Sequence, residues 1–271
     1  MVEDLHADAG RSIAQSSRRH KASVLLLSAE TSVPSGQSLP AAGVTPWERV
    51  RGSAWFPTLA SAAQQEVLDR MHTQRLAPGE ALSRQGELQT HWCGVLNGLL
   101  KWSSASRQGR SLTLGGLSVG SWFGEGSLLR QAPREAEIVA LRPSLVALLP
   151  RDVFEELVRT QPGFALFLLR HINERLQWFM GDIRAHRLLD VDSQVARALV
   201  GLFHPVLHPG ASTHLAITQE EVAQLIGISR QRCNSALRSL QTAGLLRLDR
   251  GSITVLELDT LRGRVEGGSA T

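Results

Sequence analysis

Short apolar runs separated by glycine-bearing turns characterise the segment from Leu76 to Pro150. The runs have the length of β-strands, as in Trp92–Leu96, Leu99–Ser103 and Ser111–Leu114. Many short strands at close spacing predict an antiparallel barrel or roll. A short helix is predicted before the roll, over Ala62–His72.

A helical spacing begins at Pro162, a residue suited to the first turn of a helix because the missing N–H has no partner there. Apolar residues then recur in steps of four and three, at Ala165, Leu169, Ile172, Leu176, Phe179, Ile183 and His186. A repeat of about 3.5 residues on a long helix is typical of a coiled-coil seam. The sequence therefore predicts a parallel homodimer with Leu169, Ile172, Leu176, Phe179 and Ile183 in its interface. The alternative is a helix that packs on its own domain.

The segment from Thr218 to Leu240 has the spacing of a helix-turn-helix. Thr218 and Glu221 form a capping box, which predicts a helix over Gln219–Ile226. Gly227 supplies the positive φ of a tight turn, and Ser229 caps a second helix that begins at Arg230. The buried side of this second helix is expected to consist of Cys233, Ala236, Leu237 and Leu240.

The opposite side of the second helix carries side chains that suit base edges and phosphates. An ordinary solvated helix face is the alternative, but the stretch from Arg230 to Arg250 has five arginines and one acid. A hairpin follows, with Asp249-Arg250-Gly251 as its turn, and this hairpin is expected to act as a wing. The predicted DNA contacts are Thr218, Ser229, Arg230, Gln231, Arg232, Asn234, Ser235, Arg238 and Arg250.

These patterns divide the chain into five segments. Residues 1–50 are rich in Ser, Ala, Gly and Pro and are expected to form a flexible tail. The predicted order then continues with a sensor roll, a dimerisation helix, a DNA-binding domain and a C-terminal tail, over residues 51–160, 161–190, 191–258 and 259–271.

Composition and charge limit the kinds of partner and cellular location that this chain suits. The net charge of +4 and pI near 10 suit a polyanionic partner. No apolar run approaches the ~20 residues that span a bilayer, so no membrane association is predicted. Cys93 and Cys233 form neither a disulfide framework nor a metal motif, which favours a cytoplasmic protein. Cys233 is either inert packing or a thiol switch. Two prolines argue against a metal site at His204 and His208.

Several motifs together resemble the Crp/Fnr family of bacterial regulators, over about residues 55 to 256. They are Ala77-Pro78-Gly79-Glu80, Arg84-Gln85-Gly86-Glu87, Asn97-Gly98, Trp122-Phe123-Gly124-Glu125, the long helix after Pro162, Leu189-Asp190-Val191 and the helix-turn-helix itself. The resemblance implies an α+β fold with a cyclic-nucleotide-binding-like β-roll (a jelly roll), a dimerisation helix and a C-terminal winged helix-turn-helix. It also implies double-stranded DNA and RNA polymerase as partners, and a ligand in the roll that reorients the DNA-binding heads. No catalytic motif such as a nucleophile elbow or a P-loop is present, so an enzyme is not expected.

The resemblance also identifies a candidate effector pocket. Gly124, Glu125 and Arg134 match the family's nucleotide cradle, but Glu135 stands where a hydroxyl is usual. Phe179-Met180 replaces the Thr-Ser pair that reads adenine. A carboxylate ~4 Å from a bound phosphate would repel it by about 4 kcal/mol at an effective dielectric near 20. The effector is therefore expected not to be cyclic AMP. Two possibilities follow. The effector is less anionic or more apolar than cyclic AMP, or the head binds DNA without any ligand.

In the DNA-binding head, Arg230 matches the family's guanine-reading arginine, whereas Gln231 and Ser235 depart from the family pattern. A different half-site is therefore expected. A haem-based sensor on the same fold is an alternative, with His91, His171 and His186 as candidate ligands and no cofactor otherwise certain. Four cysteines would be needed for an iron–sulfur cluster, and the chain has two.

Overall fold

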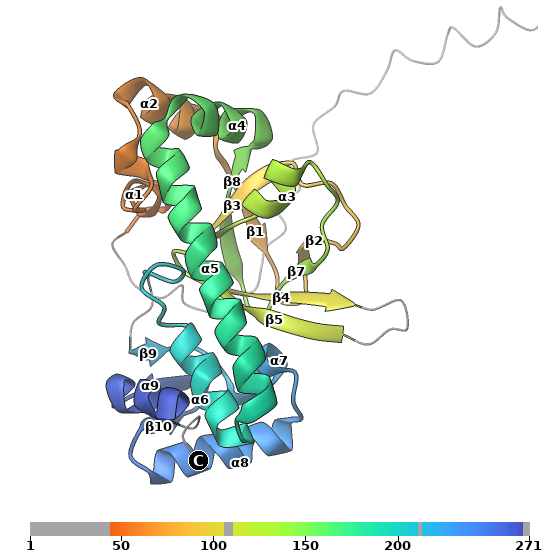
Figure 1. The fold of residues 1–271 in the computed structure, drawn as a ribbon, viewed down its shortest axis with the longest axis vertical. Helices are drawn as coiled ribbons and strands as arrows, with labels where there is room; N and C mark the ends of the chain where they lie inside the picture. The colour runs from red at the N-terminus through yellow and green to blue at the C-terminus, as the bar shows by residue number, and fades with distance from the viewer. Residues whose placement is uncertain (1–43, 106–110, 211–212, 268–271) are drawn as a thin grey trace, which may run out of the picture. The chain divides into compact units, whose positions relative to one another are not determined.

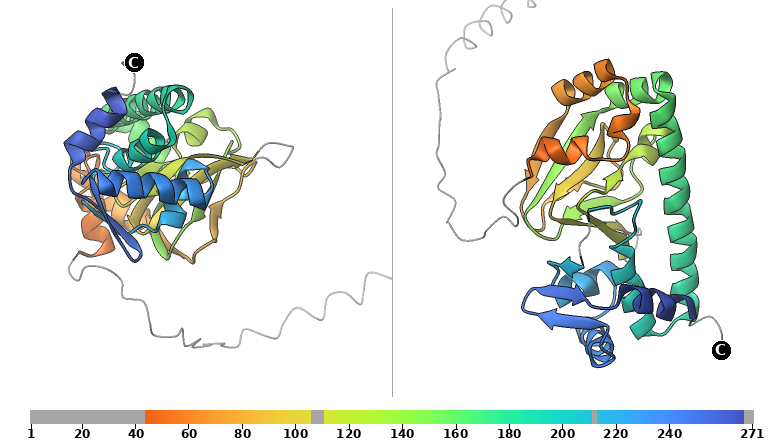
Figure 2. Two further views of the ribbon diagram at one scale, coloured as in Figure 1. Left: turned by 90° about the horizontal axis from the view of Figure 1, so that it is seen from below. Right: turned by 90° about the vertical axis from the view of Figure 1, so that its left-hand side faces the viewer.

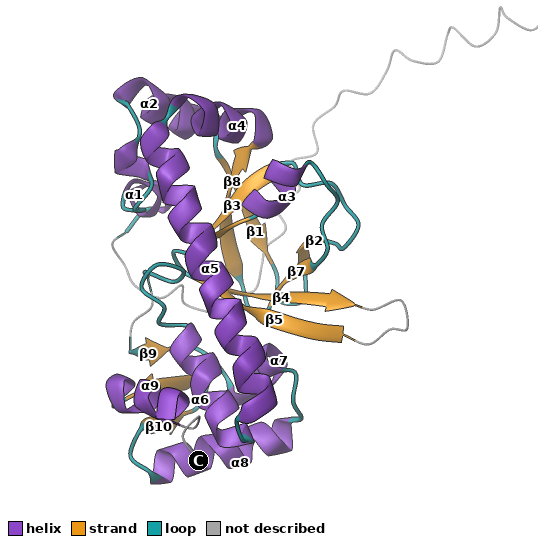
Figure 3. Ribbon diagram, in the orientation of Figure 1, coloured by secondary structure: helices purple, strands orange, loops and turns teal. Residues whose placement is uncertain are grey.

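The computed structural model describes residues 44–105, 111–210 and 213–267 (Figures 1 and 3). The sensor is a β-roll of two antiparallel sheets, as predicted. One sheet has the order β1-β8-β3-β6, with bounds His72–Leu76, Ser144–Pro150, His91–Asn97 and Trp122–Phe123. The other has the order β2-β7-β4-β5, with bounds Ala81–Ser83, Glu137–Ala140, Leu99–Ala105 and Ser111–Ser118.

The turn between β3 and β4 depends on Gly98. Its φ is +97°, a conformation that L-residues with a side chain rarely adopt. A Cβ at this position would also lie 2.1 Å from the Ser144 Oγ. The turn therefore brings β4 directly back into the second sheet, so that apolar side chains from both sheets meet. This inner core consists of Leu76, Cys93, Val95, Leu100, Leu117, Phe123, Ile138, Ala140, Val146 and Leu148.

Helices cover the outer face of the β1-β8-β3-β6 sheet (Figure 1). They are α1 (Pro46–Arg51), the 3-10 turn Phe56–Thr58, α2 (Ser61–Arg70), α4 (Arg151–Thr160) and the start of α5 (Pro162–Leu188). Trp55 lies at the centre of this contact, with its ring centroid 5.1 Å from that of Trp92 and 4.9 Å from that of Trp122.

The predicted N-terminal tail was too long, because α1 already begins at Pro46. Thr45 and Glu48 form a capping box, and Val50 is fully buried in the aromatic core. A six-residue helix is too short to produce a visible period in the sequence. Residues 1–43 lie outside the described part of the chain.

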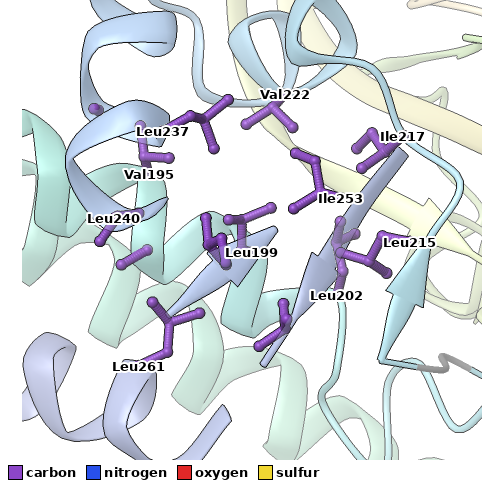
Figure 4. Packing of buried hydrophobic residues seen from close by; sticks show 14 of the residues in the cluster. Val195, Leu199, Leu202, Leu215, Ile217, Val222, Leu237, Leu240, Ile253 and Leu261 are labelled. Atoms are coloured by element: carbon purple, nitrogen blue, oxygen red, sulfur yellow. The ribbon is translucent and has the colours of Figure 1, made fainter. Parts of the chain in front are cut away.

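The DNA-binding head follows α5. Asp190 caps α6 (Val191–Gly201) by accepting from the Ser193 N–H at 2.7 Å. The head then contains α7 (Gln219–Ile226), α8 (Arg230–Thr242) and a small sheet of order β10-β11-β9. Its strands are β9 (His214–Leu215), β10 (Leu246–Asp249) and β11 (Ser252–Val255). Figure 4 shows apolar side chains from these helices and strands converging on one core, including Leu199, Val222, Leu237 and Ile253.

The predicted C-terminal tail is also corrected. Helix α9 spans Leu258–Gly267 and packs against α6. Leu261 is fully buried in the core of the head (Figure 4). Val265 is also buried there. Residues 258–265 therefore belong to the DNA-binding domain, whereas residues 268–271 lie outside the described part of the chain.

Candidate nucleic-acid interface and effector site

The helix-turn-helix forms as its sequence predicts. The Thr218 hydroxyl accepts from the Glu221 N–H at 3.1 Å, and the Glu221 carboxylate accepts from the Thr218 N–H at 2.6 Å. Gly227 ends α7 with a φ of +74°, and Ser229 caps α8 through the Arg232 N–H. Cys233, Ala236, Leu237 and Leu240 are buried, so the expected inner side of α8 is confirmed.

The outer side of α8 is open to solvent in this chain, and the view from below in Figure 2 shows α8 in front of the rest of the ribbon. The exposed residues on it are Arg230, Gln231, Arg232, Ser235 and Arg238. The Arg230 side chain is 72% exposed and lies 3.7 Å from the Glu220 carboxylate. Asn234 is half-buried, and its Oδ1 is buried without a hydrogen-bond partner. Asn234 is thus less available to DNA than predicted.

The wing is the β10–β11 hairpin. Gly251 has a φ of +85° in its turn, and the adjacent Arg250 is exposed. Arg247 on β10 lies 3.2 Å from the Asp249 carboxylate. The hairpin therefore presents Arg250 to solvent at its tip, whereas the nearby Arg247 is already paired with Asp249.

An apolar stripe runs along the outer side of α5. Exposed large apolar residues on it are Leu166, Leu169, Ile172, Leu176, Met180 and Ile183. Phe179 was predicted to belong to this stripe, but it is half-buried against the Trp102 ring of β4, with centroids 5.4 Å apart. Met180, which is 51% exposed, takes that place. The side chain of His186 lies outside the described part of the chain.

Helix α7 is attached to the sensor by contacts that the sequence did not reveal. Arg142, in the turn before β8, donates from Nε and Nη2 to the two carboxylate oxygens of Glu221, at 3.0 and 2.5 Å. The Thr113 hydroxyl of β5 donates to the Gln224 carbonyl at 2.8 Å. Leu99 and Leu141 of the roll pack into the core of the head. Glu221, the acidic member of the α7 capping box, is therefore held by the sensor directly.

His208 adds a partly buried polar contact between the head and the roll. Its Nδ1 lies 2.7 Å from the Ser121 hydroxyl and 3.2 Å from that of Ser118. Burial lowers the pKa of His208 to about 3, so the ring is neutral in the folded protein. Since the two serines are its partners, His208 connects the loop after α6 to the roll.

Acid is expected to destabilise the protein through His208. In the unfolded chain this residue takes up a proton as the pH falls through about 6.5, whereas the folded protein resists protonation. The free energy of unfolding should therefore fall by about 1.4 kcal/mol per pH unit below pH 6.5 from this residue. Urea unfolding at pH 6.5, 5.8 and 5.0 measures the slope. His208→Gln should flatten it and the exposed His214→Gln should not; equal slopes in wild type and His208→Gln would contradict the prediction.

Two of the predicted cradle residues, Gly124 and Glu125, lie where strand β6 is followed by a short helix. Gly124 begins α3 (Glu125–Arg130) with a φ of +102°, and a Cβ there would lie 2.6 Å from the Gln89 Nε2. Glu125 is buried, and its Oε1 accepts from the Arg175 Nη1 at 2.8 Å, while its Oε2 has no partner. The Glu125 carboxylate, which the resemblance places in the nucleotide cradle, is thus already paired with Arg175 of α5.

Glu135 does not act as predicted. Its side chain is 79% exposed and pairs with Arg130 at 2.9 Å, so it points into solvent. An exposed, paired carboxylate is screened and repels little. The repulsion of a bound phosphate that was predicted for Glu135 is therefore not expected in this structure.

The side of the cradle next to α5 is filled by aromatic rings. Trp102 packs edge-on against Phe179, and the Arg175 guanidinium lies 5.7 Å from the centre of the Trp102 ring. Arg175 Nη2 also donates to the Trp122 carbonyl at 2.6 Å. Phe179 lines the cavity of ≈ 70 Å³ beside Trp102, whereas the exposed Met180 does not. No local pattern in the sequence points to Trp102 or Arg175, because their role depends on a contact between β4 and α5.

Arg134 lies in a different part of the roll. It lines a cavity of ≈ 300 Å³ together with Cys93. Burial raises the pKa of Cys93 to about 11, so the thiol is neutral. The remaining lining residues are His72, Gln74, Leu82, Ser83, Glu87, Leu88, Thr90, His91 and Leu148.

The other candidate ligands are engaged within the protein. His171 is buried, with its Nε2 within 3.0 Å of the Trp122 carbonyl. The His91 Nδ1 lies 2.8 Å from the Thr90 hydroxyl. Burial raises the pKa of Cys233 to about 11, which favours inert packing over a thiol switch. Across residues 44–105, 111–210 and 213–267 no cluster of three or more His, Cys, Asp or Glu could hold a metal ion. No helix in these ranges is long and apolar enough to cross a membrane.

Comparison with known proteins gives two family matches along the chain. Residues 73–161 match the cyclic nucleotide-binding domain, and residues 193–264 match the Crp-like helix-turn-helix domain. The cyclic AMP receptor protein of Thermus thermophilus is 28% identical over 77% of this chain and 94% of its own length. A CRP-like cAMP-activated global transcriptional regulator of Mycobacterium tuberculosis is 26% identical over 71% of this chain and 89% of its own length. The structure of FixK2 from Bradyrhizobium japonicum shares the fold, with a TM-score of 0.59 and 17% identity over 71% of this chain and 96% of that one.

Proposed function

Because the chain belongs to the Crp/Fnr family of DNA-binding transcription regulators, we propose that it binds a two-fold symmetric operator as a homodimer. The protein is a regulator rather than an enzyme. In the proposed complex α5 forms the dimer interface, α8 reads the major groove, and the β-roll senses an effector other than cyclic AMP. RNA polymerase is the proposed partner at promoters, and the proposed location is the cytoplasm.

The apolar stripe on α5 is the observation that supports the proposed dimer. Its leucine, isoleucine and methionine side chains are exposed in one chain, although such residues are normally buried. Successive residues of the stripe are three or four positions apart, which keeps them on one side of the helix as in a coiled-coil seam. A second copy of the same helix, related by a two-fold axis, would bury this stripe against itself.

The DNA contact is supported by the outer side of α8. Arg230, Gln231 and Arg232 occupy its first turn, the part of a recognition helix that meets base edges. Two such helices in a symmetric dimer would enter successive major grooves, about 34–36 Å apart. This geometry requires a palindromic operator with half-sites one helical turn apart.

Three observations favour an effector other than cyclic AMP. Phe179 offers no hydroxyl to an adenine edge. Glu125 is already neutralised by Arg175, and Trp102 fills space beside Phe179.

Selection of bound sequences from random double-stranded DNA, with the full chain and no added ligand, tests this function. The expected result is an inverted repeat whose half-sites have centres about 10–10.5 base pairs apart. Enrichment of single, unpaired half-sites would contradict the symmetric dimer. Failure to enrich any sequence, with and without added cyclic AMP, would contradict sequence-specific binding by this chain.

A further inference from the structure

A separate cavity lies between the roll, its helices and the head, and we call it the outer cavity. Its walls come from α1 and the turn after it, the first half of α5 and the loop after α6. It shares no lining residue with the cavity at Arg134 or with the one beside Trp102. Its volume is ≈ 200 Å³. Since an apolar cavity of about 150 Å³ can hold benzene, the outer cavity has room for one aromatic ring with a small substituent.

Two tryptophan rings line the outer cavity. Trp55 and Trp122 meet edge to face, with centroids 4.9 Å apart. The Trp122 Nε1 donates to the Ser53 hydroxyl at 3.1 Å. The same ring lies against β3 at Gly94, where a Cβ would come within 2.7 Å of it. The ring is therefore held in place by two elements, and such preformed aromatic faces favour a planar ring as the ligand.

Phe167 and His171 of α5 also line the outer cavity and stack on each other, with centroids 5.4 Å apart. Burial, and then the charge of Arg175, lower the pKa of His171, so its ring is neutral. The His171 Nδ1 and the Trp55 Nε1 are buried and have no hydrogen-bond partner among the described residues. A ligand in the cavity lies next to the rings that carry these two nitrogens. A ligand with oxygen atoms therefore suits the cavity better than a hydrocarbon does.

Arg49 of α1 brings a positive charge to the outer cavity. It is half-buried, and it forms no ion pair within the part of the chain that the structure describes. The adjacent Glu48 is engaged by the Thr45 N–H at 2.6 Å. Among the described residues, no Asp or Glu lines the cavity. A guanidinium without an acidic partner can bind a carboxylate through two hydrogen bonds, so the charge favours an anionic ligand.

The loop after α6 forms the wall of the outer cavity that belongs to the head. Gly210 of this loop packs closely on the turn before β6, because a Cβ on Gly210 would lie 2.8 Å from the Val119 carbonyl oxygen. A Cβ on Gly120 would lie 3.0 Å from the Gly210 N. Val206 and Pro209 of the same loop line the cavity. A ligand bound there therefore contacts the sensor and the head together.

We propose that the outer cavity binds a small carboxylate that carries a single aromatic ring. Arg49 binds the carboxylate, while Trp122 and Phe167 contact the ring. Because this ligand touches the roll, α5 and the head, its binding stabilises the arrangement in which the three meet. The site needs neither DNA nor a dimer, so it stands apart from the proposed function.

Calorimetric titration of the full-length protein with benzoate, benzyl alcohol and acetate tests the proposal. Benzoate has both the ring and the charge, whereas benzyl alcohol lacks the charge and acetate lacks the ring. Benzoate should bind at least tenfold more tightly than either of the other two compounds. An absence of benzoate binding, or equally tight binding of benzyl alcohol or acetate, would overturn the proposal.

Variants locate the bound benzoate. Arg49→Gln should weaken its binding at least tenfold, whereas Arg51→Gln should leave it unchanged, because Arg51 is exposed on α1 and does not line the cavity. Phe167→Leu should weaken it about two- to tenfold, because an aliphatic side chain replaces one aromatic face. Circular dichroism checks that the variants are folded.

Two results with these variants would overturn the proposal. One is benzoate binding of wild-type strength in Arg49→Gln or in Phe167→Leu. The other is loss of benzoate binding in Arg134→Gln together with full binding in Arg49→Gln, because the ligand would then lie in the cavity of the roll. All of these titrations are made without DNA, so their outcome does not depend on operator binding.

Discussion

Leu176→Asp is expected to convert the dimer into a monomer and to lower operator affinity at least a hundredfold. Leu176 lies in the middle of the exposed stripe of α5 and is 54% exposed in one chain. In the proposed dimer the same residue of the partner lies near it across the two-fold axis. Two carboxylates would then be buried together without a counterion, which costs several kcal/mol.

The loss of affinity follows from the loss of the dimer. A dimer binds its second half-site intramolecularly, and linkage of this kind raises affinity by about 10²–10⁴ over a single module. Sedimentation velocity and electrophoretic mobility shift on the selected operator are the two measurements. Leu129→Asp is the matched control, because Leu129 is a similarly exposed leucine on α3, away from the stripe. A Leu176→Asp protein that sediments as the wild-type dimer would remove α5 from the interface.

The sequence predicts those parts of this protein that depend on local spacing. The capping box of α7, the turn at Gly227 and the cap at Ser229 lie where their residues predict them, because each depends on neighbours within a few positions. The strands of the roll follow in the same way from glycine turns such as Gly98. Helices α1 and α9 were missed because each is short and gains its stability by packing on a distant element.

The candidate effector site shows where local spacing stops being informative. The 3.5-residue repeat alone does not show whether Phe179 or Met180 lies on the exposed stripe. A straight helix has 3.6 residues per turn, so its exposed side drifts relative to that repeat. The decision depends on Trp102, which is distant in sequence and meets α5 only in the folded chain. Glu135 was placed in the pocket by its position in a motif, but its pairing with Arg130 turns it outward.

Arg142 and Glu221 illustrate the same limit for the coupling of the two domains. Neither residue stands out in the sequence as part of a pair, and they are 79 positions apart. In the structure their bidentate contact joins the turn before β8 to the first turn of α7. A shift of that turn would therefore act on the helix-turn-helix without passing through α5.

Arg230→Ala is expected to remove most of the sequence preference of the protein at one symmetric pair of base positions. Arg230 is the first residue of α8, and its long exposed side chain can donate two hydrogen bonds to a guanine. Each such contact contributes about 1–3 kcal/mol of discrimination, and a symmetric dimer makes two of them. The affinity for the selected operator should therefore fall by roughly 30-fold to 10⁴-fold, since about 1.4 kcal/mol corresponds to tenfold.

Arg232→Ala separates base reading from phosphate binding. Arg232 is exposed on the same first turn of α8, and we expect it to contact a phosphate. Its loss should weaken the binding of all sequences alike and flatten the dependence of affinity on salt, whereas Arg230→Ala should leave affinity for unrelated DNA nearly unchanged. Arg262→Ala is the control, because Arg262 lies on α9 and pairs with Asp259. Titrations of selected and scrambled operators at several salt concentrations measure both effects. If Arg230→Ala kept the full preference for the selected operator, guanine reading would have to be assigned to another residue of α8.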